Sequence, residues 1–209
     1  MLIRQPMDLL DVGVPAERDA RVDELMRQVG LRPEMKWLYP HQFSGGQRQR
    51  IGLARALATN PALVVFDEPV SALDVAVQAQ VLNLIRRLQR ERGLTYLFIS
   101  HDLGVVRQVC DDVGVMYLGQ MVEAAPAAAL YAEPLHPYTQ ALIAAAPSMS
   151  QRRVARPAPI QGDPPSPINL PPGCRFAARC PLAQPICREA PPALRELRPQ
   201  HRVACHLAA

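Results

Sequence analysis

Apolar residues recur at helical spacing in three parts of the first hundred residues. The spacing over 22–29 predicts an amphipathic helix, and Gly30 follows it where a left-handed C-terminal cap would lie. A second apolar stripe predicts a helix over 44–60, which ends at an Asn-Pro pair. A third predicts a helix over 74–93, with Asp74 as its N-cap.

Two short apolar runs, 62–66 and 95–99, are typical of strands that are buried on both faces. A helix between two such strands predicts a βαβ unit with a parallel sheet. Asp67 and Glu68 follow the first strand, and His101 comes just after the second. Ligands of α/β proteins bind at the carboxyl ends of parallel strands, so we expect these polar side chains to lie at a binding site.

The last third of the chain has a different character. Residues 113–117 and 120–123 predict a hairpin around Leu118-Gly119. Twelve of the 22 prolines lie in the last 59 residues, where 9 basic residues face 3 acidic ones. Each proline removes a backbone donor, so this tail is expected to contain neither long helices nor central strands.

Composition excludes several classes of protein. The chain has 209 residues, of which 49% are hydrophobic and 5% aromatic, so its core must be aliphatic. No apolar run approaches the roughly 20 residues that span a bilayer. Arg4, Pro6 and Asp8 interrupt the segment where a signal peptide would need an apolar stretch. By these criteria the chain is neither exported nor membrane-spanning.

The start of the second predicted helix carries the first candidate site. Ser44 stands at the N-cap and Gln47 three residues later, which is the spacing of a capping box. Gly45 and Gly46 let a ligand approach the backbone, and the helix dipole favours an anion such as a phosphate. The alternative interpretation is an ordinary capped helix after a glycine turn.

The acidic pair after the first strand carries the second candidate site. Asp67 offers the hard oxygen ligand that a hydrated Mg²⁺ ion prefers, while Glu68 can orient an attacking water. His101 can donate a hydrogen bond to a phosphoryl oxygen as charge builds there. The alternatives are a solvated acidic turn and a structural histidine.

In combination these motifs resemble the ATP-binding subunits of ABC transporters. FSGGQRQR at 43–50 is similar to the signature motif, LVVFDEP at 63–69 to Walker B, SALD at 71–74 to the D-loop, and ISHD at 99–102 to the switch-histidine segment. The resemblance implies the following roles: Ser44, Gly45, Gly46 and Gln47 at the nucleotide of the opposite subunit, Asp67 at Mg²⁺, Glu68 at the hydrolytic water, Asp74 at the dimer contact and His101 at the γ-phosphate.

One motif of that family is missing from the sequence. A P-loop follows the pattern Gly-x-x-x-x-Gly-Lys-Ser/Thr, but Lys36 is the only lysine and no glycine lies near it. We therefore expect an N-terminally truncated chain that is inactive alone, because the donors for the β- and γ-phosphates are absent.

The C-terminal part of the chain resembles a narrower group within that family. Residues 135–142, LHPYTQAL, and the cysteines after them resemble the C-terminal extension of oligopeptide, dipeptide and nickel importer ATPases. The resemblance implies a [4Fe-4S] cluster, and cluster ligand spacing varies more than zinc spacing. Zinc and free structural thiols are the alternatives. The candidate ligands are Cys174, Cys180, Cys187 and Cys205.

These interpretations combine into one expectation. The fold class is α/β, with a P-loop-NTPase-like ABC ATPase core: residues 1–40 form a remnant of the helical subdomain, 41–125 the ATPase core, and 126–209 a proline-rich extension with four cysteines. The resemblance implies ATP and Mg²⁺ as cofactors and energising of oligopeptide, dipeptide or nickel import.

The resemblance also implies partners and a location. The partners are a second ATP-binding subunit, the transmembrane permease subunits and, indirectly, an external peptide-binding protein. The location is the cytoplasmic face of the inner membrane, with peripheral attachment. No nucleic-acid partner is expected, because the arginine-rich tail offers only Phe176 for base stacking. The alternative functions are a non-catalytic metal- or cluster-bearing interaction fragment and a DNA-repair ABC ATPase.

Overall fold

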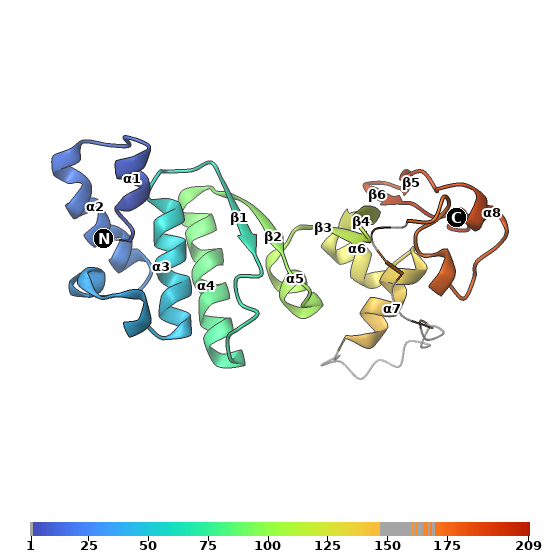
Figure 1. Cartoon of the computed structure of the whole chain (residues 1–209), viewed down its shortest axis with the longest axis horizontal. Helices are drawn as coiled ribbons and strands as arrows, with labels where there is room; N and C mark the ends of the chain where they lie inside the picture. The colour runs from blue at the N-terminus through green and yellow to red at the C-terminus, as the bar shows by residue number, and fades with distance from the viewer. Residues whose placement is uncertain (1, 147–159, 161, 163–164, 167, 169) are drawn as a thin grey trace. The chain divides into compact units, whose positions relative to one another are not determined.

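A computed structural model describes residues 2–146, 160, 162, 165–166, 168 and 170–209 of the chain. The chain forms two compact units, Met1–Asp102 and Leu103–Ala209 (Figure 1). The first unit contains the following elements in chain order: α1 (Gln5–Leu9), η1 (Pro15–Glu17), α2 (Arg18–Gln28), η2 (Pro33–Trp37), η3 (Pro40–Gln42), α3 (Gly45–Leu57), β1 (Leu63–Asp67), α4 (Val75–Arg92) and β2 (Thr95–Ile99).

The predicted βαβ unit is confirmed. β1 and β2 pair in parallel, from Leu63 opposite Thr95 to Asp67 opposite Ile99, and α4 is the crossover between them. Asp74 caps α4, since its Oδ1 accepts a hydrogen bond of 2.9 Å from the backbone N–H of Val77. At the other end Gly93 has a φ of 63°, which is the left-handed geometry of a C-cap. Local sequence signals therefore set both ends of this helix.

The expectation that the two strands are buried on both faces is wrong. In β1, Val64 and Phe66 are buried, whereas Leu63 and Val65 are 52% and 55% exposed. In β2, Leu97 and Ile99 are 53% and 47% exposed. α3 and α4 lie against one side of the strand pair in the described part of the chain, so only alternate residues of β1 are covered (Figure 1). A continuous apolar run in the sequence therefore does not mean that both faces of this strand are buried.

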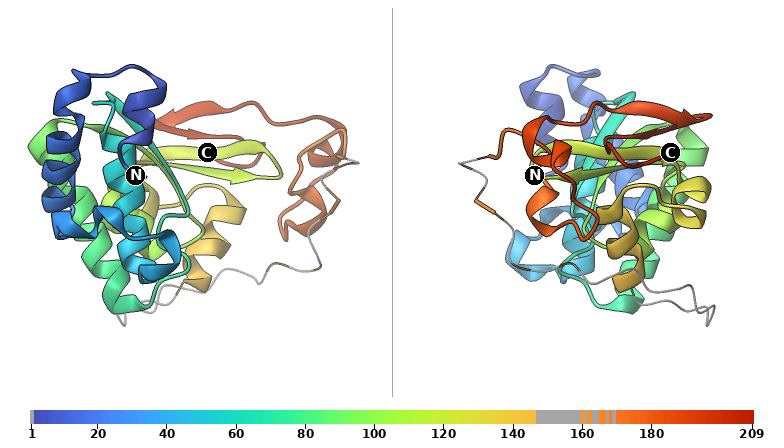
Figure 2. Two further views of the ribbon diagram at one scale, coloured as in Figure 1. Left: turned by 60° about the vertical axis from the view of Figure 1, so that its left-hand side comes forward. Right: turned by 90° about the vertical axis from the view of Figure 1, so that its right-hand side faces the viewer.

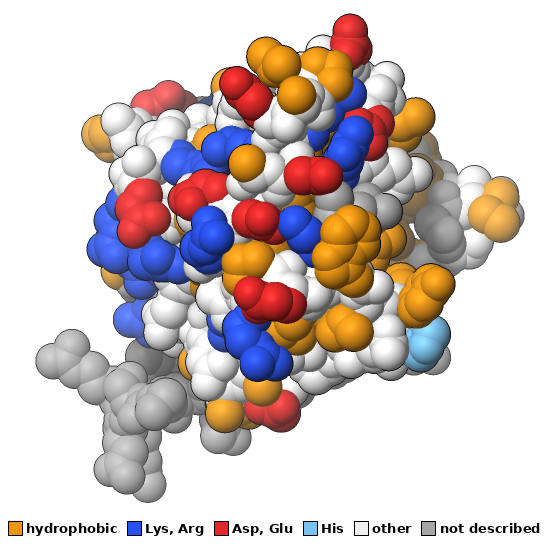
Figure 3. Space-filling model, turned by 90° about the vertical axis from the view of Figure 1, so that its left-hand side faces the viewer, with side chains coloured by type: hydrophobic (Ala, Val, Ile, Leu, Met, Phe, Trp, Pro, Cys, Tyr) orange, Lys and Arg blue, Asp and Glu red, His pale blue; other side chains and the backbone are white. Residues whose placement is uncertain are grey.

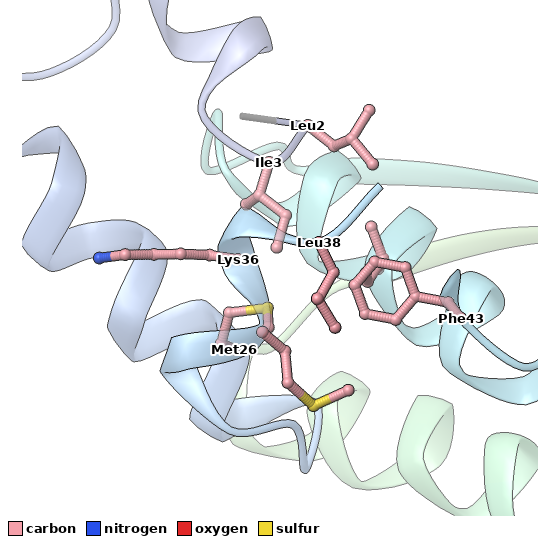
Figure 4. A pocket seen from close by; sticks show the side chains of 8 residues that line it. Leu2, Ile3, Met26, Lys36, Leu38 and Phe43 are labelled. Carbon is pink, nitrogen blue, oxygen red and sulfur yellow. The ribbon is translucent and has the colours of Figure 1, made fainter. Parts of the chain in front are cut away.

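The helical part of the first unit contains a small, mostly apolar pocket. Ile3, Met26, Leu38 and Phe43 point toward one small pocket, which they line with neighbouring apolar side chains (Figure 4). The aliphatic stem of Lys36 also lines this pocket, and its Nζ lies 2.5 Å from Asp23. The lysine therefore has a structural ion-pair partner.

Charges of both signs intermingle on the face of this unit shown in Figure 3.

Arg18 is only 6% exposed and donates to the carbonyl of Val12 at 3.0 Å. Its guanidinium also pairs with Asp8 at 3.1 Å and Asp11 at 2.7 Å. A buried guanidinium needs such partners for its donors, so this residue fixes the loop between α1 and α2.

The second unit combines short helices with a four-stranded antiparallel sheet of order β3-β4-β6-β5. Figure 2 shows β5 and β6 running alongside the β3–β4 hairpin. Its elements are α5 (Leu103–Val109), β3 (Asp112–Tyr117), β4 (Gln120–Pro126), α6 (Ala127–Ala132), α7 (Pro137–Ala145), η4 (Ala177–Arg179), α8 (Ile186–Glu189), β5 (Arg195–Arg198) and β6 (His201–Val203).

The predicted hairpin is confirmed, and the expectation of a tail without central strands is wrong. Leu118 and Gly119 have φ values of 46° and 75°, as a two-residue hairpin turn with left-handed geometry requires. β6 lies between β4 and β5 in the sheet. Pro199 falls in the turn between β5 and β6, so the strands themselves keep all their backbone donors.

A buried carboxylate joins the hairpin to the segments that follow it. Glu123 has no exposed surface. Its oxygens accept hydrogen bonds from the backbone N–H groups of Leu135 at 2.7 Å and His136 at 3.0 Å, and from Nε2 of His201 at 2.7 Å. Burial lowers the pKa of His136 to about 4, so its neutral Nδ1 accepts from the Tyr138 N–H at 3.1 Å. One side chain on β4 thus fixes both the start of α7 and the position of β6.

Replacing Glu123 with alanine is expected to destabilise the chain strongly. The substitution leaves two buried donors and one partly buried donor without an acceptor, which costs about 3 kcal/mol or more in the free energy of unfolding. Urea unfolding followed by circular dichroism measures the change. Glu133→Ala is the matched control, because Glu133 pairs with Arg198 in an exposed position, where ion pairs contribute little. Equal effects of the two substitutions would contradict the buried role of Glu123.

Candidate functional site at the ends of α3, β1 and β2

The N-terminus of α3 has the capping geometry that its sequence predicts. Ser44 Oγ accepts a hydrogen bond of 3.3 Å from the backbone N–H of Gln47. In return, Gln47 Oε1 accepts one of 3.0 Å from the backbone N–H of Ser44. This capping box defines the first turn of the helix, where backbone N–H groups lack partners within the helix.

The two glycines after Ser44 lie against α4 and the loop before it. A Cβ atom on Gly46 would lie 2.4 Å from Cγ1 of Val77, and one on Gly45 would lie 3.2 Å from Cδ2 of Leu73. Close approach of the two helix starts therefore requires glycine at position 46. Packing alone accounts for that residue, whether or not a ligand contacts the helix.

Glu68 lies at the end of β1 in a backbone conformation that L-residues rarely adopt. Its φ is 46°, and its backbone N–H donates to the carbonyl of Ile99 at 3.0 Å, extending the ladder between the strands. The Glu68 carboxylate then meets the ring of His101, with Nδ1 and Oε1 2.9 Å apart. The structure thus brings together two predicted site residues that are 33 positions apart.

The contact changes the protonation of the histidine. The hydrogen bond from His101 to Glu68 raises the pKa of His101 above its usual value, and the nearby Glu68 charge acts in the same direction. Both side chains are accessible, at 72% for His101 and 47% for Glu68. Other molecules can therefore reach this acid–imidazole pair from solvent.

The other two predicted acidic residues lie nearby in the chain but play different local parts. Asp67 is exposed and lines a cleft of about 190 Å³ between α3, β1 and α4, together with residues such as Gln49 and Pro69. Asp74 is exposed, but one of its oxygens already caps α4. An exposed carboxylate at a strand end suits Mg²⁺, which usually keeps several waters and takes few protein ligands.

The four cysteines predicted as metal ligands, all in the second unit, lie near one another. The pKa values of Cys174 and Cys180 are raised, first by burial and further by the neighbouring thiols, including Cys187 and Cys205. The backbones of Cys174 and Cys187 share a hydrogen bond of 2.8 Å. Within the described residues, however, no three His, Cys, Asp or Glu side chains are arranged to hold a metal ion. The prediction of an iron–sulfur or zinc site gains no support from this geometry.

Sequence reasoning missed Ser71 as a member of the site. Its Oγ donates to the carbonyl oxygen of Glu68 at 3.1 Å. The sequence places Ser71 in the D-loop resemblance, which indicates a loop but not this contact. The sequence also does not indicate the positive φ of Glu68, because the residue at that position is not a glycine.

Two family profiles match the chain. The profile of the ABC transporter family matches residues 3–71, and that of the oligopeptide/dipeptide transporter C-terminal region matches residues 122–187. The first includes α3 and β1, which carry the candidate site, and the second includes Glu123 and the HPY segment.

Curated relatives match nearly the whole chain. The oligopeptide transport ATP-binding protein AppF of Bacillus subtilis is 54% identical over 99% of this chain and 63% of its own length. A probable peptide ABC transporter ATP-binding protein, y4tS of Sinorhizobium fredii, is 50% identical over 100% of this chain and 59% of its own length. The chain thus spans less than two thirds of the length of these relatives.

Solved structures agree with these matches. The protein cbiO1 of Clostridium perfringens, part of the ABC transporter complex cbiONQ, aligns with a TM-score of 0.54 and 28% identity over 61% of this chain and 51% of its own. An ATP-binding cassette solved as a dimer in a post-hydrolysis state with ADP and Pi aligns with a TM-score of 0.52 and 29% identity. The alignment covers 60% of this chain and 54% of that structure's chain.

Fold and motifs therefore define the class as the ABC ATPases. Together with the C-terminal profile and the curated relatives, they show that the chain belongs to the family of oligopeptide/dipeptide ABC transporter ATP-binding subunits. Among the described residues, no helix has both the length and the apolar character needed to cross a membrane.

The packing requirement at Gly46 yields a first prediction for this site. Gly46→Ala is expected to lower the free energy of unfolding by about 1 to 3 kcal/mol, because the β-branched Val77 side chain has little freedom to move away. Gly52→Ala is the control in the same helix, since a Cβ there meets nothing within 4 Å. That control is expected to stabilise the chain by about 0.5 to 1 kcal/mol. Chemical denaturation measures both variants, and a neutral Gly46→Ala would contradict the close contact.

The Glu68–His101 pair yields a second prediction. Glu68→Gln removes the charged acceptor, so the pKa of His101 is expected to fall toward its ordinary value. In the unaltered chain the raised pKa means that the charged pair is fully formed below the usual histidine range and is lost as the pH rises through the raised value. Histidine ring proton shifts followed by NMR against pH measure both values, with His101→Gln identifying the signal. An unchanged pKa in Glu68→Gln would show that the pair does not form.

Proposed function

We propose that this chain is the nucleotide-hydrolysing part of a subunit that energises ABC-type import of oligopeptides or dipeptides. The observation that carries the proposal is the Glu68–His101 contact of 2.9 Å at the carboxyl ends of two adjacent parallel strands. An accessible acid beside an imidazole can orient a water and stabilise charge on a phosphoryl group. Family membership favours ATP as the source of that group.

In this proposal the residues of the site divide the chemistry between them. Glu68 accepts a proton from the attacking water, and His101 donates a hydrogen bond to the γ-phosphate. The N-terminus of α3, with Ser44, Gly45 and Gly46, contributes backbone N–H donors to the nucleotide of the opposite subunit. Gln47 stabilises that helix start through the capping box, and Asp74 holds the start of α4 at the dimer contact.

Asp67 is the residue that would hold Mg²⁺. Its carboxylate is exposed, follows a strand and lines a cleft, which suits a hydrated ion that also binds phosphate oxygens. When bound, the ion would neutralise negative charge on the phosphates. The iron–sulfur cluster is left out of the proposed function, because the described cysteines do not present a metal-binding arrangement.

The proposal includes partners of the kinds known for the family. A second ATP-binding subunit completes the composite site, and permease subunits transmit the work of hydrolysis to the transported peptide. The chain then lies at the cytoplasmic face of the membrane. The similarity to an oligopeptide transport protein and a probable peptide transport protein supports peptides as the transported class.

Replacing Glu68 tests the catalytic role. In a protein that carries this chain behind a Gly-x-x-x-x-Gly-Lys-Ser/Thr segment, Glu68→Gln is expected to reduce Mg²⁺-dependent phosphate release by about 100-fold or more, because the general base is lost. Glu91→Gln is the matched control, because Glu91 is an exposed residue of α4 that pairs with Arg87 at 3.7 Å. Unchanged turnover in Glu68→Gln would refute the proposal. The 209 residues alone are expected to release no phosphate.

A further inference from the structure

We infer that Ser71 is a positioning residue: its hydroxyl holds the left-handed backbone of Glu68 and thereby aims the carboxylate at His101. The inference rests on the proposed function of the Glu68–His101 pair, but its geometry concerns the chain alone. Ser71 lies in the exposed loop between β1 and α4, three residues after Glu68. It touches no reacting group and acts through the backbone of Glu68.

The backbone of Glu68 needs external support. A non-glycine residue with a φ of 46° is strained, because its Cβ crowds the following carbonyl group. Such conformations persist when the surroundings determine them more than once. Rotation of this φ back to the ordinary region would redirect the side chain away from the end of β2.

Two clamps hold this residue, one on each side of its peptide unit. On the N-terminal side, the Glu68 N–H donates to the carbonyl of Ile99 at 3.0 Å, which ties it to β2. On the other side, its carbonyl accepts from the Ser71 Oγ at 3.1 Å and from the Ser71 backbone N–H at 3.4 Å. The backbone bond is the longer of the two, so the hydroxyl is the stronger part of the second clamp.

Residues on both sides of Ser71 anchor the loop. Val70 is 4% exposed and Asp74 begins the cap of α4, so both ends of the loop are fixed while Glu68 and Ser71 are exposed. Loss of the hydroxyl would therefore release Glu68 without disturbing a buried contact. This separation makes a positioning role measurable apart from stability.

The pKa of His101 reports where the Glu68 carboxylate lies. The charged groups that act on His101 are Glu68, from the end of β1, and its own neighbour Asp102. Ser71→Ala leaves both carboxylates in the chain, so only the distance between Glu68 and His101 changes. We expect the variant to lower the pKa of His101 by about half or more of the drop seen in Glu68→Gln, as the hydrogen bond becomes intermittent.

Two further variants complete the test. Ser71→Thr keeps the hydroxyl and is expected to restore the pKa of the unaltered chain. Thr59→Ala removes a comparable hydroxyl bond, from Oγ1 to the Ala56 carbonyl at 3.5 Å, and is expected to leave His101 unchanged. Circular dichroism checks that every variant is folded.

An unchanged His101 pKa in Ser71→Ala would overturn the inference, and so would an equal fall in Thr59→Ala. Neither outcome bears on ATP turnover, which the Glu68→Gln activity measurement tests separately. Conversely, a catalytically irrelevant Glu68 would leave the Ser71 effect on the His101 pKa in place. The two failures are therefore distinguishable.

Discussion

Parallel pairing of β1 with β2 fixes where the two halves of the candidate site meet. Residues at the same end of neighbouring parallel strands lie side by side, so the register that places Asp67 opposite Ile99 also places Glu68 and His101 within reach of each other. The bond from the Glu68 N–H to the Ile99 carbonyl continues this ladder one residue beyond the strand. The helix caps of α3 and α4 do not bring Glu68 to His101 by themselves; the strand register does.

Much of the first unit follows from local signals in the sequence. The bounds of α4 follow from Asp74 and Gly93, which cap it, and the start of α3 follows from the Ser44–Gln47 capping box. Residues 95–99 form the predicted strand. Each of these features depends on backbone chemistry within a few residues, which a sequence encodes directly. Burial of β1 does not, because covering its second face depends on segments distant in the chain.

The second unit shows the same limit more clearly. The hairpin at Leu118-Gly119 is predictable, since two strand-like runs separated by two residues, one of them glycine, are typical of a hairpin. The position of β6 in the middle of the sheet is not, because it depends on a contact between His201 and Glu123, 78 residues apart. A buried glutamate in β4 looks unfavourable until its three donors are known. Proline density predicted a tail without central strands, and this was wrong because the strands form between the prolines.

Strain at Glu68 and close packing at Gly46 show how different constraints act on the same site. Gly46 lacks a side chain because Val77 occupies the space, so that position serves the contact between α3 and α4 whatever lies at the helix tip. Glu68 has the opposite character, since its backbone has an unusual φ of 46° and three hydrogen bonds, to Ile99 and to Ser71, flank it. A residue held in a costly conformation at an exposed strand end is difficult to explain by stability alone. That contrast favours the acid and its supporting hydrogen bonds over the glycine turn as the part of this unit that stability does not explain.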